Sequence, residues 1–174
     1  MNRYLTSANE ELKRVDHLVY VSLKYTRTVD ILKSIIERMI NAFDFAILAL
    51  LEKHQEKDQT IEIPKSPGLR TKILKELYEK EPAILEFLDF YHLLRDLSRA
   101  DFKRTKEFRR HVTMTAMLHD GEMEINIDII TDYYHRCKIF VKLIQKIIES
   151  DGKEKIKELV KSSVVEMDFE RGKL

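Results

Sequence analysis

One uninterrupted amphipathic stretch, residues 28–52, constrains the fold of this chain more than any other feature. It runs for about seven helical turns without Gly or Pro. Its apolar residues recur every three or four positions, as on a helix with one wide apolar face: Val29, Leu32, Ile35, Ile36, Met39, Ile40, Phe43, Ala46, Ile47, Leu50 and Leu51. A helix with such a face must pack against several others. The stretch therefore predicts the central helix of a bundle.

The remaining sequence shows further helical periods and little punctuation. The chain has only four Gly and three Pro, which favours long helices over many strands. Pro64, Pro67 and Gly68 mark a linker at about 57–68. We expect the first helix to end near 24–28, where Thr28 is placed to cap the next one. Further helices are predicted over 69–80, 83–108, 129–149 and 153–167.

The period changes from helical to alternating after residue 111. Val112, Met114, Ala116 and Leu118 alternate with less apolar residues, and Met123 and Ile125 do so after an Asp120–Gly121 turn. This pattern predicts a β-hairpin over about 112–128 with its apolar face on the bundle. The predicted fold is mainly all-α. It is one domain over residues 1–174, an antiparallel bundle of five to six helices with one small hairpin.

Composition excludes several classes of protein and site. Charged residues make up 35% of the chain at a net charge of +1, which excludes a uniformly basic nucleic-acid coat. Cys137 is the only cysteine, and no apolar run reaches the length of a membrane span. We therefore expect a cytoplasmic protein without membrane contact, and the scarcity of Asn and Gln beside Lys and Glu resembles a thermophile. No glycine-rich phosphate loop or His and Cys spacing predicts a cofactor or a metal.

The most basic segment spans residues 99–111. On a continued helix, five cations fall on one face: Arg95, Arg99, Lys103, Lys106 and Arg110. Two interpretations are open, namely the solvated face of an amphipathic helix and a stripe that binds the phosphates of a nucleic acid. Phe108 is expected on the inward side, so no aromatic ring accompanies the stripe and base readout is not predicted.

Arg104 and His111 are seven residues apart, which is about two helical turns. A continued helix places both on its inward side, bordered by Asp101 one turn before Arg104. An Arg beside a His can bind a phosphate while the imidazole transfers a proton. The alternative is a structural ion pair of Asp101 with Arg104, in which His111 only ends the helix.

The spacing of Arg104-Thr-Lys-Glu-Phe-Arg-Arg-His111, with Asp101 one turn earlier, resembles the motif of the HEPN superfamily. The helix order and residues 16–21 also look like small archaeal proteins of this kind. The resemblance implies a helical bundle, often a homodimer, that binds RNA or is a metal-independent RNase. In an RNase His111 would be the general base and Arg104 would stabilise the phosphorane. Thr105 follows Arg104, where many active members have Asn, Asp or His, so a non-catalytic module that binds RNA, a partner protein or its own copy is the alternative.

Overall fold

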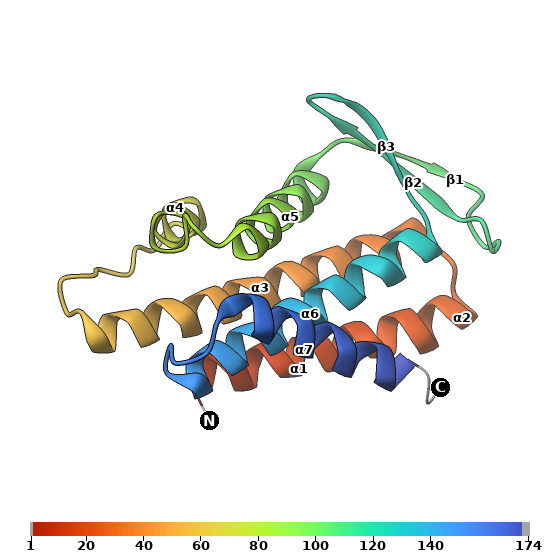
Figure 1. Ribbon diagram of the computed structural model, residues 1–174. Helices are drawn as coiled ribbons and strands as arrows, with labels where there is room; N and C mark the ends of the chain where they lie inside the picture. Colours follow the sequence, from red (N-terminus) through yellow and green to blue (C-terminus); the bar gives the residue numbers. More distant parts are fainter. Residues whose placement is uncertain (1, 172–174) are drawn as a thin grey trace.

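The computed structural model describes residues 2–171 (Figure 1). Of the expected domain over 1–174, residue 1 and residues 172–174 lie outside the described part. The helices are α1 (Arg3–His17), α2 (Leu23–Tyr25), α3 (Val29–Lys57), α4 (Pro67–Leu77), α5 (Pro82–Arg99), α6 (Ile127–Ser150) and α7 (Ile156–Arg171). A π-helical segment, η1 (Leu18–Ser22), joins α1 to α2 without a break. Counting α1, η1 and α2 as one, six helices lie within residues 2–171, and the mainly all-α prediction is confirmed.

Helix α3 lies at the centre of the bundle, as predicted. It packs between α1 and α6 on one side and α4 and α5 on the other (Figure 1). The side chain of Thr28 accepts a hydrogen bond from the Ile31 N–H and caps the helix. The expected apolar stripe is buried except at Ile40, which is partly exposed. Phe43 stacks on Phe140 with ring centroids 4.4 Å apart, which ties α3 to α6 at the middle of the core.

The segments that join the helices follow the sequence signals closely. The first helix starts at Arg3, where the side chain of Asn2 accepts hydrogen bonds from the N–H groups of Tyr4 and Leu5. It ends at Tyr25, within the predicted interval. Residues 58–66 connect α3 to α4, close to the expected linker, and α5 begins at Pro82. None of the helices within residues 2–171 combines the length and apolar character needed to cross a membrane.

The predicted hairpin is present, and a third strand extends it. Strands β2 (Thr113–Leu118) and β3 (Gly121–Ile125) pair antiparallel around a tight turn, where Gly121 adopts a φ of 127° that suits glycine. Strand β1 (Phe102–Thr105) pairs antiparallel with the other edge of β2. Met114, Ala116 and Ile125 are buried, so the apolar face of the sheet packs on the bundle.

Candidate functional site

The expected helix that carries Arg104 and His111 is not formed. Helix α5 ends at Arg99, Ala100 is extended with ψ 147°, and Arg104 lies in β1. His111 lies in the turn that precedes β2. The prediction of a helix to residue 108 is therefore wrong beyond Arg99. The physical reason is the hairpin, because two strands alone are marginally stable and β1 satisfies the open edge of β2.

This change of backbone separates the five cations that were expected on one helical face. Arg95 and Arg99 remain on α5, Lys103 lies on β1, and Lys106 and Arg110 lie in the connection from β1 to β2. The guanidinium of Arg95 also donates a hydrogen bond to the hydroxyl of Tyr91, on the same helix, at 3.1 Å. The prediction of a continuous basic stripe along one helix is thus wrong, because the five cations are distributed over α5, β1 and the connection from β1 to β2.

Arg104 has two carboxylate partners, neither of them the expected Asp101. One terminal nitrogen of the guanidinium lies 2.8 Å from Asp30 on α3, and the other lies 3.3 Å from Glu107. This contact holds the pKa of the Asp30 carboxyl below its usual value and raises the pKa of Arg104. Asp101 instead accepts a hydrogen bond at its backbone oxygen from the Met117 N–H at 2.8 Å. Arg104 therefore forms structural ion pairs, as the alternative interpretation expected, but its partners are Asp30 and Glu107 and not Asp101.

Residues 106–111, called here the basic loop, lie in the connection between β1 and β2. Lys106, Arg109, Arg110 and His111 are all exposed. Phe108 is exposed over 74% of its surface and does not face inward as expected. The backbone has φ of 54° at Lys106 and 63° at Phe108, values that few non-glycine residues adopt. An aromatic ring and four basic side chains thus share one loop. The sequence analysis did not predict this, because it placed Phe108 on the inward side of a helix.

The basic loop is anchored to the connection between α2 and α3. The Phe108 N–H donates to the Arg27 carbonyl at 2.6 Å. The Glu107 carboxylate accepts a hydrogen bond from the Val29 N–H at 3.1 Å and also pairs with Arg104. These contacts hold the backbone at Glu107 and Phe108, immediately before the exposed ring, so the left-handed conformation of Phe108 is supported by its surroundings.

His111 lines a hollow of about 240 Å³ beside the N-terminus of α6. The hollow places Lys106, Arg110 and His111 near two carboxylates, Glu124 and Asp128. Arg104 is not among its lining residues and pairs with α3 instead. The structure therefore does not bring the guanidinium of Arg104 and the imidazole of His111 into one hollow.

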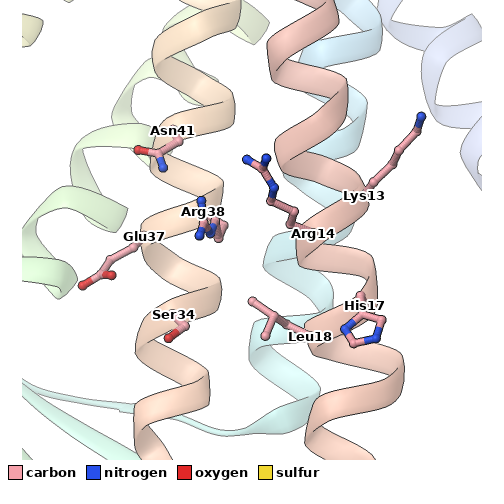
Figure 2. A pocket seen from close by; sticks show the side chains of 8 residues that line it. All are labelled: Lys13, Arg14, His17, Leu18, Ser34, Glu37, Arg38 and Asn41. Carbon is pink, nitrogen blue, oxygen red and sulfur yellow. The ribbon is translucent and has the colours of Figure 1, made fainter.

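A larger cavity, which sequence reasoning missed, lies between α1 and α3. Its volume is about 680 Å³. Figure 2 shows Arg14 and Leu18 extending from the first helix toward α3, where Arg38 lies opposite. The complete lining is Lys13, Arg14, His17, Leu18, Ser34, Glu37, Arg38 and Asn41. We call this cavity the α1–α3 pocket.

A buried carboxylate, that of Glu11, pairs with two of the arginines that line the α1–α3 pocket. The side chain of Glu11 is only 6% exposed and pairs with both Arg14 and Arg38, the latter at 3.3 Å. Asn41 donates a further hydrogen bond to it at 3.3 Å. A buried charge needs such partners. The sequence signal was an acidic residue at a core position, between Ala8 and Val15 on the buried face of α1.

Among the described residues, no three His, Cys, Asp or Glu side chains gather as a metal ion would require. Comparisons with protein-family models, curated proteins and solved structures find no match to this chain. The likeness to HEPN domains therefore depends on the sequence motif alone, and function has to be inferred from the side chains and their surroundings.

Proposed function

We propose that this protein binds single-stranded RNA through the basic loop, residues 106–111. In this proposal the Phe108 ring stacks on a base, while Lys106, Arg109 and Arg110 contact the phosphates on either side. Stacking and backbone electrostatics together are the usual means by which proteins hold a single strand without reading its sequence. The observation that carries the proposal is the exposure of Phe108, 74%, among these cations.

The exposed ring of Phe108 does not contribute to the stability of the fold. An aromatic side chain normally buries its surface, and a φ of 63° at a non-glycine residue adds strain. Both features persist because Arg27 binds the N–H of Phe108 and Val29 binds the side chain of Glu107, directly before the ring. Strain that the surroundings maintain is characteristic of functional sites. A ring fixed in an outward position also loses little conformational freedom when a base stacks on it.

The charge of the basic loop favours an anionic ligand. Its one acidic residue, Glu107, is engaged by Arg104 and by the Val29 N–H. Lys106, Arg109 and Arg110 are therefore not neutralised within the loop. For three phosphate contacts to a single strand, log K should fall with log salt at a slope of about −2.

The proposal covers binding and not cleavage. In the nuclease hypothesis Arg104 stabilises the phosphorane beside a His111 base, yet Arg104 is bound by Asp30 and Glu107. We expect wild type, Arg104→Ala and His111→Ala to show the same background activity on single-stranded RNA. Cleavage that only wild type performs would restore the enzyme hypothesis.

The test is binding of a fluorescein-labelled oligoribonucleotide, measured by anisotropy at several salt concentrations. We expect Phe108→Ala to lower the affinity about five- to 150-fold, the range for one stacked base. The Arg109→Ala and Arg110→Ala variants should each reduce the salt slope by about 0.7. Equal affinity of Phe108→Ala and wild type would refute base stacking, and no binding by wild type at low salt would refute the proposal.

Two matched controls use exposed residues distant from the basic loop. Leu69→Ala on α4 removes an apolar side chain that is 53% exposed, and Lys161→Ala on α7 removes an exposed cation. Both controls should bind RNA as wild type does. The same losses in the controls would show that affinity follows total charge or apolar surface and not the loop.

The homodimer, partner-protein contact and cytoplasmic location expected from the sequence remain predictions beside this proposal. Light scattering after gel filtration measures the first of them directly. A dimer that dissociates on RNA binding would place the self-contact on the loop, whereas a dimer that persists would place it elsewhere.

A further inference from the structure

We infer that the α1–α3 pocket is a second site, separate from the basic loop, which binds the phosphate group of a small phosphorylated molecule. The inference goes beyond RNA binding, because it concerns a different pair of elements and a different set of cations. Its basis is that Arg14 and Arg38, which lie on facing helices in Figure 2, both pair with the single buried carboxylate of Glu11.

The charge of the pocket is not balanced by its own side chains. Arg14 and Arg38 contribute two positive charges, and the carboxylate with which both pair, Glu11, contributes one negative charge. Figure 2 shows Lys13 directed away from α3 and Glu37 directed away from α1, so neither changes this balance between the two helices. One carboxylate between two arginines leaves a positive centre, which a phosphate can neutralise.

The two arginines also retain hydrogen-bond capacity. A guanidinium has five N–H donors, whereas only three hydrogen bonds join Arg14 and Arg38 to Glu11. Their side chains are 54% and 43% exposed, so the remaining donors are accessible from the pocket. Glu11 thus orients two planar donors without consuming them, and planar arginine donors match the oxygens of a phosphate.

The dimensions and lining indicate a small molecule. A volume of about 680 Å³ lies within the range of ligand sites and exceeds the needs of one phosphate group. Leu18 supplies an apolar wall, and Ser34 and Asn41 supply hydrogen-bonding groups for the rest of the ligand. The lining has no Phe or Tyr on which a base of RNA would stack.

Ser34 offers the sharpest test, because it is exposed, lines the pocket and lies outside the Glu11 network. Ser34→Asp introduces a carboxylate into the pocket, and Ser34→Asn introduces a side chain of the same size without charge. Pyrophosphate is the probe, titrated by calorimetry at constant ionic strength. We expect Ser34→Asn to bind within twofold of wild type and Ser34→Asp to bind at least tenfold more weakly.

Arg14→Gln and Arg38→Gln provide a second measurement. Each leaves the other arginine beside Glu11, so the buried carboxylate keeps a charged partner. Each arginine variant should also weaken pyrophosphate binding about tenfold or more. The two Ser34 variants should have the same melting temperature as wild type. Equal binding by Ser34→Asp and Ser34→Asn, or no saturable heat from wild type at millimolar pyrophosphate, would overturn the inference.

Phosphate groups occur in both RNA and small molecules, so the titrations are repeated with an oligoribonucleotide and with Phe108→Ala. We expect Phe108→Ala to bind pyrophosphate as wild type does and the oligoribonucleotide not to displace it. Displacement by RNA in both proteins would overturn the assignment to a small molecule. Weaker RNA binding by Phe108→Ala together with unchanged pyrophosphate binding would support both proposals. The two assays are independent, so the RNA proposal and the phosphate proposal can each be refuted separately.

Discussion

The backbone of Phe108 allows stability and RNA binding to be separated by two substitutions at one position. Phe108→Ala removes the ring and keeps a side chain at a φ of 63°, whereas Phe108→Gly removes the ring and the steric conflict together. Both variants should therefore lose the same RNA affinity. The Gly variant should nevertheless be the more stable of the two.

The size of this difference follows from two opposing effects. A left-handed conformation costs an L-residue about 1–2 kcal/mol. Glycine loses about 0.5–1 kcal/mol more than alanine in chain entropy on folding. At the centre of these ranges, Phe108→Gly is more stable than Phe108→Ala by about 0.75 kcal/mol. In a chain of this size, that difference raises the melting temperature by about 1.5–3 °C.

Thermal unfolding followed by circular dichroism measures the difference, and anisotropy measures RNA affinity in the same samples. At Lys106, which has a φ of 54°, the Gly variant should likewise have a higher melting temperature than the Ala variant. Arg109 has no positive φ, so there Gly should be less stable than Ala. An Ala variant of Phe108 as stable as the Gly variant would show that the loop does not hold this residue in the left-handed region.

Three further predictions concern the bundle and its ion pairs. Phe43→Ala should lower the free energy of unfolding in urea by about 3–5 kcal/mol, because Phe43 is fully buried between Tyr91 and Phe140. Burial raises the pKa of the Cys137 thiol, so iodoacetamide should label it only in unfolded protein, and fast labelling of native protein would contradict the packing. Arg104→Gln should lower the melting temperature at pH 7. Because Arg104 holds the pKa of Asp30 below its usual 3.8, the part of this difference that comes from the Asp30 pair should be lost as the pH falls below that value and Asp30 is protonated.

The bundle was predictable because its signals are local. The apolar period of residues 28–52, the cap at Thr28 and the prolines near residue 66 each act within a few positions of the chain. The hairpin was equally clear, since alternation and a turn residue lie within one segment. Local patterns of this kind determine which element forms and roughly where it ends.

The segment that was mispredicted depends on contacts with distant residues. Lys, Arg and Glu between 99 and 111 have good helix propensity, which favours an extension of α5. That propensity is overridden by the pairing of β1 with β2 and by the contacts of Arg104 with Asp30 and of Phe108 with Arg27. Because the chain turns from helix to strand after Arg99, the candidate side chains beyond that residue, and Phe108 with them, lie in surroundings that the helical prediction did not give.

The α1–α3 pocket was not predictable for a similar reason. Its partners, Arg38 and Asn41, lie 27 and 30 residues from Glu11 and meet it only after two helices pack. The acidic residue at a core position was visible in the sequence, but the cations that surround it were not identifiable.

The π-helical segment between α1 and α2 has a consequence for the length of the first helix. In an α-helix the positions three and four residues after Val19 lie at the two edges of the buried face, and here Ser22 is partly exposed while Leu23 is buried. The π-helical turn Leu18–Ser22 is itself wider than an α-helical one and holds one additional residue. Shortening the chain by Val21, which is 40% exposed, would place Leu23 three residues after Val19, a position that ordinary α-helical geometry keeps on the buried side. The first helix can thus lose a residue at this point without turning its later side chains away from the core, a tolerance that α3 does not have.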